Sequence, residues 1–345
     1  MRPDPLEVPI TPTLLESHGA HWALPDYVVA CCFDRDGHLA FALGDGSLRL
    51  RAPGTESPLR EVAAHAGACL SLAPAPDGGF LSGGDDGGFL RISQAGDVET
   101  LASFPRRWVE HVQGHTNGLV ACAVGRALHL FPRGQAAVVH EYASTIGGLS
   151  FSPDGQRVAV AHYGGVSIRS TRHARNDPQL LRWAGSHLGV TWSPNGRFVL
   201  SMMQENAIRG WRLEDKSDLR MSGYQRKVSH WAWVDRGRYL ATSGADCAPC
   251  WPFLTRKGPM DQAPLTPGER SGRLVTTVAG DPTRALIATG YDDGMVLLCL
   301  LDGQAPAMVR DAAGDGISAL AISQDGRQLA VGSEHGFAGW LALPR

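Results

Sequence analysis

The amino-acid sequence predicts an all-β fold built from small antiparallel sheets that repeat along the chain. About every 41 residues, an apolar run reaches an Asp-Gly or Asn-Gly corner, continues as alternating apolar residues and turns into a further short strand. The corner glycines Gly37 and Gly78 are 41 residues apart, and so are Gly155 and Gly196. A fixed period of this length is typical of sheets arranged radially around an axis. We therefore expect one β-propeller domain over residues 1–345.

Each repeat begins with a strand of small, alternating apolar residues, which suits a crowded position beside a central channel. Such segments occur at 28–33, 69–73, 108–112, 146–151, 188–192, 228–233, 274–278 and 317–322. The third strand of a repeat ends in a large apolar residue such as Trp211 or Trp340, which is expected to bury its side chain between neighbouring sheets. These repeats predict eight four-stranded antiparallel blades, with seven blades as the alternative.

The two ends of the repeat array predict how the ring is closed. The last repeat stops after its third strand, and residues 10–18 precede the first repeat without a blade of their own. We expect residues 10–18 to pair as the missing outer strand, because this removes an exposed sheet edge. The Pro- and Gly-rich stretch 255–272, between the sixth and seventh repeats, is expected to form a surface loop with a short outer strand inside it.

Composition and charge exclude several classes of function. The formal net charge is −2 and the basic residues are scattered, so the basic patch needed for nucleic-acid binding is missing. No segment resembles a signal peptide, and none approaches the roughly 20 apolar residues of a membrane span. The seven cysteines are an odd number, which favours a reducing compartment. We expect a cytoplasmic protein that binds neither nucleic acid nor membrane, and the Arg-, Ala- and Gly-rich composition is typical of a GC-rich bacterial genome.

The pattern of a turn followed by Trp at 206–213, and the corners at 152–155 and 193–196, resemble the WD40-repeat family over nearly the whole chain. The chain departs from that family because it has no Trp-Asp dipeptide. The resemblance implies a β-propeller that acts as a non-catalytic scaffold for protein interactions. Its partner would be a protein or peptide, and the chain itself a monomer or a subunit of a hetero-complex.

The resemblance also implies a hydrogen-bonded set of His, Ser or Thr, Asp and Trp within each blade. Parts of this set are present in two repeats. The second repeat retains His65, Ser82 and Asp86, and the sixth retains Ser243, Asp246 and Trp251. No repeat retains all four residue types, so the set is expected to be incomplete throughout.

Aromatic and arginine side chains in the loops predict a partner-binding surface on one face of the propeller. Trp, Tyr and Arg dominate binding hot spots because each combines a large contact area with a polar group. Loops on a rigid scaffold hold such side chains at small entropic cost. The expected residues of this face are Trp22, Tyr27, Arg106, Arg107, Trp108, Tyr142, Tyr163, Gln204, Glu205, Tyr224, Arg226, Tyr291 and Glu334.

Two alternative functions remain open from the sequence. Cys247 and Cys250 have the two-residue spacing of zinc motifs, and His187 and His230 could meet at a channel mouth, so a metal-associated, zinc-handling protein is possible. A propeller hydrolase with a channel metal is the other alternative. No nucleophile elbow, phosphate-binding loop or paired His on a helix is present, so we expect no catalytic residues and no cofactor.

Overall fold

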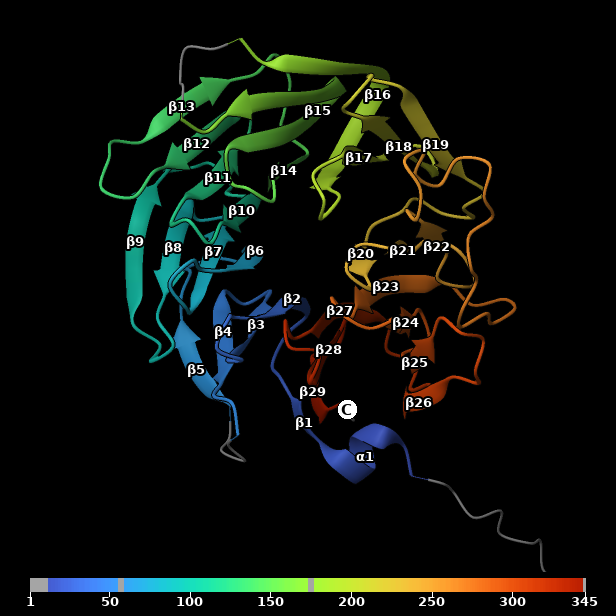
Figure 1. Ribbon diagram of the computed structural model, residues 1–345. Helices are drawn as coiled ribbons and strands as arrows, with labels where there is room; N and C mark the ends of the chain where they lie inside the picture. The colour runs from blue at the N-terminus through green and yellow to red at the C-terminus, as the bar shows by residue number, and fades with distance from the viewer. Residues whose placement is uncertain (1–11, 55–58, 173–176, 344–345) are drawn as a thin grey trace, which may run out of the picture.

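The computed structural model describes residues 12–54, 59–172 and 177–343, whose strands form antiparallel sheets that follow one another around a ring (Figure 1). Seven sheets are present in these ranges, and five of them have four strands. The chain is therefore an all-β, single β-propeller with four-stranded antiparallel blades, as the repeats predict. Within the described ranges, no helix is long and apolar enough to cross a bilayer.

The first three sheets each use four consecutive strands, in chain order from the middle of the ring outwards. Sheet one comprises β2 (Val28–Phe33), β3 (Leu39–Leu43), β4 (Ser47–Arg51) and β5 (Arg60–Ala63). Sheet two comprises β6 (Cys69–Pro74), β7 (Phe80–Gly84), β8 (Gly88–Ile92) and β9 (Val98–Ser103). Sheet three comprises β10 (His111–Gly114), β11 (Val120–Val124), β12 (Ala127–Phe131) and β13 (Val138–Glu141).

The fourth and fifth repeats share one six-stranded sheet, which makes the blade count seven rather than the expected eight. Its strands are β14 (Gly148–Phe151), β15 (Arg157–Ser170), β16 (Gln179–Trp192), β17 (Phe198–Met203), β18 (Ala207–Arg212) and β19 (Asp218–Ser222). The long strands β15 and β16 continue through positions where other repeats have a turn or a loop. Their pairing shifts register between Tyr163 and Gly165, so an irregularity stands where the sequence predicts a break.

The remaining sheets complete the ring. One has three strands, β20 (Trp231–Val234), β21 (Tyr239–Thr242) and β22 (Cys250–Pro252). The next has β23 (Val275–Gly280), β24 (Leu286–Tyr291), β25 (Val296–Leu300) and β26 (Ala307–Arg310). The last contains β27 (Ile317–Ile322), β28 (Gln328–Ser333) and β29 (Phe337–Ala342), with β1 (Gly19–Ala23) as its outer strand.

The outer strand of the last sheet comes from a different segment than the sequence predicts. Residues 14–18 form helix α1 (Leu14–His18), so the prediction of a strand over 10–18 is wrong; residues 10 and 11 lie outside the described residues. Strand β1 pairs instead with β29, from Gly19 opposite Leu341 to Ala23 opposite Phe337. A capping box explains the helix, because Thr13 and Glu16 satisfy each other's backbone N–H groups at its start.

The corner glycines form the tight turns that the sequence predicts at these positions. Gly37, Gly155 and Gly326 have φ values of 84°, 65° and 69°, in the left-handed region that other residues rarely adopt. The apolar faces of the sheets then pack against their neighbours. One buried cluster joins Leu48 of β4 to Phe80 of β7 and so links the first two sheets. The core of the molecule is therefore a series of such clusters between adjacent blades.

The stretch 255–272 lies along the outer edge of the three-stranded sheet. It makes a single bridge to that sheet, in which Cys250 and Leu265 exchange backbone hydrogen bonds of 2.8 and 3.1 Å. This bridge stands where the sequence predicts a short outer strand. Farther along, the Tyr291 hydroxyl donates to the Gly268 carbonyl, and Arg270 forms two hydrogen bonds to Asp293. The stretch is thus fixed to the blade on either side of it.

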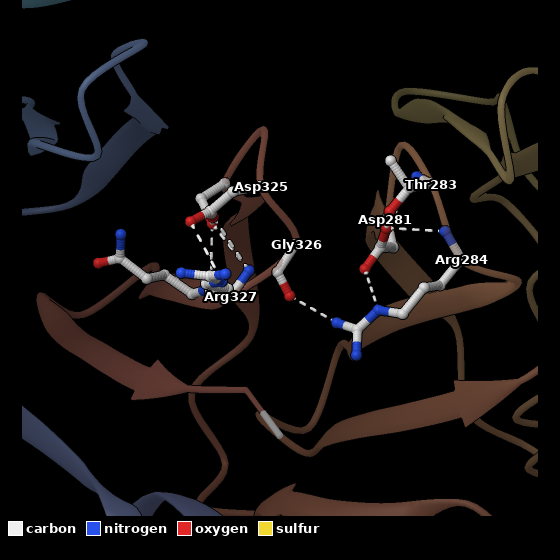
Figure 2. A network of polar contacts seen from close by, with 8 residues as sticks. Asp281, Thr283, Arg284, Asp325, Gly326 and Arg327 are labelled. Carbon is white, nitrogen blue, oxygen red and sulfur yellow. Dashed lines mark hydrogen bonds and ion pairs between the residues drawn. The ribbon is translucent and has the colours of Figure 1, made fainter. Parts of the chain in front are cut away.

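Polar side chains connect neighbouring blades at the corners between first and second strands. Figure 2 shows one example, in which buried Asp281 accepts hydrogen bonds from the backbone and side chain of Thr283 and from Arg284. Burial alone would raise the pKa of Asp281, but these donors lower it below its ordinary value. Arg284 also donates to the carbonyl of Gly326 in the next corner. Asp281 therefore orients the arginine that joins the last two blades.

Replacing Asp281 by Ala should lower the free energy of unfolding by about 2–4 kcal/mol, because a half-buried guanidinium and two backbone N–H groups lose their acceptor. The matched control is Asp325→Ala in the neighbouring corner, whose carboxylate is about half exposed; its cost should be about 1 kcal/mol or less. Urea denaturation of both variants measures the difference. Equal losses in the two variants would contradict the role assigned to Asp281.

Candidate functional site

Alternation of the strands places two kinds of connection on the same edge of the ring. In each four-stranded sheet, the turn between the second and third strands lies on the same edge as the loop from the fourth strand to the next sheet. We call this edge the top face. It carries most of the residues that the sequence predicts to bind a partner, because those residues lie in or beside these turns and loops.

Three top-face segments enclose a pocket of about 720 Å³ beside sheet three. They are the loop 104–110 after β9, the turn 125–126 between β11 and β12, and the start of the loop 142–147 after β13. We call it the Arg-Trp pocket. Its lining residues are Arg106, Arg107, Trp108, Glu110, Gly125, Arg126, Glu141, Tyr142 and Thr145. Four of these, Arg106, Arg107, Trp108 and Tyr142, were predicted from the sequence to lie on a binding face.

The backbone of the loop 104–110 is held in one conformation. Phe104 N–H donates to Gly87 O at 2.8 Å, and Val109 N–H donates to Gly84 O at 3.0 Å. A further bond from Arg107 N–H to Phe104 O closes a turn in which Arg106 has a positive φ of 64°. That conformation costs an L-residue about 1–2 kcal/mol, so the surrounding contacts impose it.

Trp108 is the large aromatic side chain that this loop presents to solvent, next to the exposed Arg106 and Arg107. It is 59% exposed, although its neighbour Val109 is fully buried. The backbone on both sides of it, at Arg107 and Val109, is hydrogen-bonded. A rigidly mounted, exposed aromatic ring loses little conformational entropy when a partner binds.

Two predicted tyrosines, Tyr142 in the loop after β13 and Tyr163 in β15, lie beside the loop 104–110 or the segments that enclose the pocket with it. Tyr163 is 67% exposed, and its backbone N–H donates to the Ser144 hydroxyl oxygen at 3.0 Å, which ties it to the loop 142–147. Tyr142 is partly buried, and its ring lies 5.5 Å from that of His162 and beneath the Arg169 guanidinium. Burial raises the pKa of the Tyr142 hydroxyl. Tyr163 is therefore available to a partner, whereas Tyr142 forms part of the pocket wall.

Several other predicted residues lie exposed on the top face but outside the Arg-Trp pocket. Tyr27 is 40% exposed. The partial burial of its hydroxyl raises the pKa of that group, and the negative charge of the nearby Glu334 raises it to a smaller extent. The remaining exposed members of the predicted set are Gln204, Glu205, Arg226 and Glu334. These residues belong to other blades, so the structure does not bring the whole predicted set into one site.

Three predicted partner-binding residues have structural roles instead, and the sequence prediction is corrected for them. Trp22 lies in β1 and packs partly buried against the core of the first and last sheets. Tyr224 is buried, and its hydroxyl oxygen contacts Thr242 at 3.0 Å and accepts from Trp251 Nε1 at 2.7 Å. Tyr291 is fully buried and holds the stretch 255–272 through Gly268.

The polar set expected in the second repeat is confirmed. His65 Nε2 lies 2.9 Å from Ser82 Oγ, and His65 Nδ1 lies 3.0 Å from Asp86 Oδ1. Burial alone would raise the pKa of Asp86. Hydrogen bonds from the backbone N–H groups of Gly88 and Ala66 lower this pKa, and the net shift is below its ordinary value. The set connects the loop before β6 to the turn after β7.

In the sixth repeat, the expected set of Ser243, Asp246 and Trp251 does not form. The Ser243 hydroxyl accepts backbone N–H groups from Ser229 and His230, at 3.2 and 3.0 Å. Trp251 instead joins the Tyr224 hydroxyl, so a tyrosine takes the place of the histidine.

The residues considered for a metal are engaged elsewhere. His187 lies 2.8 Å from the Ser201 hydroxyl through Nδ1 and 3.0 Å from the Trp183 carbonyl through Nε2. His230 Nδ1 contacts the Thr276 carbonyl at 3.0 Å. Burial raises the pKa of the Cys247 thiol to about 11 and that of Cys250 still higher, whereas metals bind thiolates. No group of three or more His, Cys, Asp or Glu side chains among the described residues is placed to hold a metal ion.

The sequence missed five residues that line the Arg-Trp pocket: Glu110, Gly125, Arg126, Glu141 and Thr145. Arg126 follows Gly125 in the turn between β11 and β12, so the sequence signal was a Gly-containing turn that lacks the usual Asp. Glu110 also lines a central channel of about 470 Å³, together with His111 and His230 from the inner edges of their blades. The pocket and the channel therefore meet at Glu110.

Comparison with known proteins agrees with this geometry. Residues 56–89 match the family described as WD domain, G-beta repeat, and this segment contains His65, Ser82 and Asp86. No curated protein matches the sequence significantly. Among solved structures, the chain is similar to the C-terminal WD40 domain of Sif2, with 15% identity over 95% of this chain and 99% of that one, and a TM-score of 0.75.

Two further structures show the same likeness. The computationally designed Ika8 protein is 16% identical over 93% of this chain and 98% of its own, with a TM-score of 0.74. A chain of the Mitotic Checkpoint Complex is 15% identical over 97% of this chain and 98% of its own, with a TM-score of 0.64. Identities this low establish the fold and nothing further. The chain thus carries a WD40 repeat at residues 56–89 and has the fold of the WD40 propellers throughout.

Proposed function

We propose that this chain is a non-catalytic cytoplasmic scaffold that binds a protein or peptide partner on its top face. It would act as a monomer or as one subunit of a hetero-complex, without a cofactor. Propellers of the WD40 type commonly bind proteins, and one similar structure comes from an assembly, the Mitotic Checkpoint Complex. The proposal rests on the surface of this chain rather than on that likeness.

The distribution of exposed hydrophobic side chains carries the proposal. Within the described residues, the large hydrophobic side chains that remain exposed include three aromatics, and all three, Tyr27, Trp108 and Tyr163, lie on the top face. Of the exposed aliphatic residues, Val98, Val139 and Met308 lie on outer strands, and Leu254 and Leu265 lie in the segment after β22. Exposed aromatic residues on rigid loops mark binding surfaces more strongly than scattered aliphatics do.

Replacing Trp108 and Tyr163 together by Ala should weaken partner binding at least about tenfold, because each ring removes contact area worth more than about 1 kcal/mol. The measurement is affinity capture from the cells that make the protein, with the bound proteins compared between wild type and variant. Thermal melting should change little, because both rings are mostly exposed.

The matched control replaces Val98 and Val139 by Ala, which removes exposed apolar surface from the outer strands only. This variant should capture the same proteins as the wild type. If the Trp108 and Tyr163 variant captures an unchanged set, or if the control loses the same protein, the top face is not the binding surface.

A further inference from the structure

The charges of the top face are unevenly distributed around the ring. The turns and loops 311–316, 333–336, 24–27, 44–46, 64–68 and 84–88 contain no lysine or arginine. They contain the carboxylates Asp26, Asp45, Asp85, Asp86, Asp311, Asp315 and Glu334. We call these residues the acidic arc. Most of them are exposed, so this part of the face repels an anionic partner.

The Arg-Trp pocket adjoins the acidic arc, because its loop 104–110 is hydrogen-bonded to the segment 84–88. Arg106, Arg107 and Arg126 line it from two segments of the chain, and within the described residues none of their guanidinium groups forms an ion pair. Two carboxylates also line the pocket, but Glu110 lies at the mouth of the channel and Glu141 at the end of β13. The pocket thus has one more positive than negative charge, next to an acidic surface.

The position of these arginines favours a carboxylate ligand. Arg106, Arg107 and Arg126 bring three positive charges to one pocket, where like charges repel one another. The hydrogen-bonded turn that gives Arg106 its positive φ fixes the backbone that carries Arg106 and Arg107. A carboxylate relieves that repulsion and accepts two parallel hydrogen bonds from a guanidinium group. Trp108 stands beside them with a large exposed ring, which suits an apolar side chain next to the acidic one.

We propose that the Arg-Trp pocket binds an acidic peptide segment of the partner, whose Asp or Glu carboxylates pair with Arg106, Arg107 and Arg126 while a neighbouring apolar side chain covers Trp108. This inference rests on the proposed function, because it specifies the chemistry of the partner at the same face. It also places the partner on the top face: the acidic segment lies over sheet three, and the negative charge of the acidic arc repels it from that part of the face.

Selection from a displayed library of random peptides tests the proposal. The wild-type propeller should enrich peptides that contain Asp or Glu next to an apolar residue. The variant with Arg106→Glu, Arg107→Glu and Arg126→Glu should bind the selected peptides at least about tenfold more weakly. For the wild type, raising the salt concentration from about 0.1 M to about 1 M should weaken binding strongly, because the Debye length falls from about 10 Å to about 3 Å.

The matched control is Arg133→Glu, which reverses an exposed charge in the turn between β12 and β13, on the edge of sheet three opposite the top face. It should leave binding of the selected peptides within about twofold of the wild type. All four arginines are exposed, so circular dichroism and melting should confirm that the variants fold.

Two results would overturn the inference. One is enrichment of peptides without acidic residues, or no enrichment at all. The other is unchanged binding of the selected peptides by the variant with three reversed charges. Either result leaves the proposed function standing if the Trp108 and Tyr163 variant still loses its partner in the capture experiment. If the Trp108 and Tyr163 variant keeps its partner and the variant with three reversed charges keeps the selected peptides, the proposal of a binding site on the top face is wrong as a whole.

Discussion

Deleting residues 1–23 is expected to lower the free energy of unfolding by at least about 5 kcal/mol, which is most of the stability of a typical domain. The deletion removes β1, so the five backbone pairings with β29 are lost and the outer edge of the last sheet is exposed. It also removes buried Leu15, which packs with Leu341 and Val309 of the last two sheets. Guanidinium denaturation measures the loss, and light scattering should detect aggregation through the exposed edge.

A point substitution assigns this effect to the described contacts. Leu15→Ala should cost about 2–4 kcal/mol, because it leaves a cavity between α1 and the last sheet. His18→Ala, in the same helix but exposed, should cost less than about 0.5 kcal/mol. A truncated protein that melts within a few degrees of the full chain would show that β1 and α1 are not needed to hold the ring together.

Acidification from pH 7.5 to pH 5 is expected to lower the free energy of unfolding. Burial lowers the pKa of five histidines below the ordinary value, namely His111, His129, His140, His187 and His230. Each pKa unit of lowering contributes about 1.4 kcal/mol, and the five contributions act in the same direction.

The direction of this dependence follows from proton binding. The unfolded chain takes up protons on these histidines near their ordinary pKa of about 6.5, while the folded chain takes them up only at lower pH. Their contribution to stability is therefore complete above about pH 6.5 and is lost as the pH falls through that value. The aspartates with lowered pKa, such as Asp281 and Asp86, lose their contribution only below about pH 4, so the two effects occupy separate ranges.

Urea denaturation at a series of pH values tests this expectation. His187→Gln keeps a polar side chain near Ser201 and Trp183 but removes one titrating imidazole, so the stability of this variant should fall less steeply between pH 7 and pH 5. His18→Gln is the control, because it removes an exposed imidazole. Stability that stays constant from pH 7.5 to pH 5 would contradict a cost of protonating the buried histidines.

The sequence predicts the propeller because its signals are local. A corner glycine needs a positive φ whatever surrounds it, and the glycines at 37, 155 and 326 all have it. The polar set of His65, Ser82 and Asp86 was also predictable, because the resemblance to the WD40-repeat family implies that these three side chains are hydrogen-bonded to one another. By contrast, the merging of two repeats into one sheet depends on how β15 and β16 pair, which no single repeat specifies.

The sequence predicts the binding face only in part, for a reason that concerns side-chain direction. Tyr291 ends β24 and Tyr163 lies within β15, yet Tyr291 is fully buried and Tyr163 is 67% exposed. Successive residues of a strand point to opposite sides, and strand pairing is irregular beside both tyrosines, so the repeat pattern does not fix the side to which each ring points. The Arg-Trp pocket was missed as a unit because Arg126 comes from a turn distant in sequence from Arg106 and Arg107.

The shared sheet of β1 and β27–β29 has a consequence for how the protein is made. Its outer strand precedes its other three strands by most of the repeats, so this blade cannot assemble until residue 342 has been synthesised. Until then, the nascent chain carries Leu15 and the unpaired β1 exposed, while the loop that must close contains all the other sheets. The intervening blades can form earlier, but closure of the ring has to wait for this pairing, and chaperones that bind apolar segments should act before it.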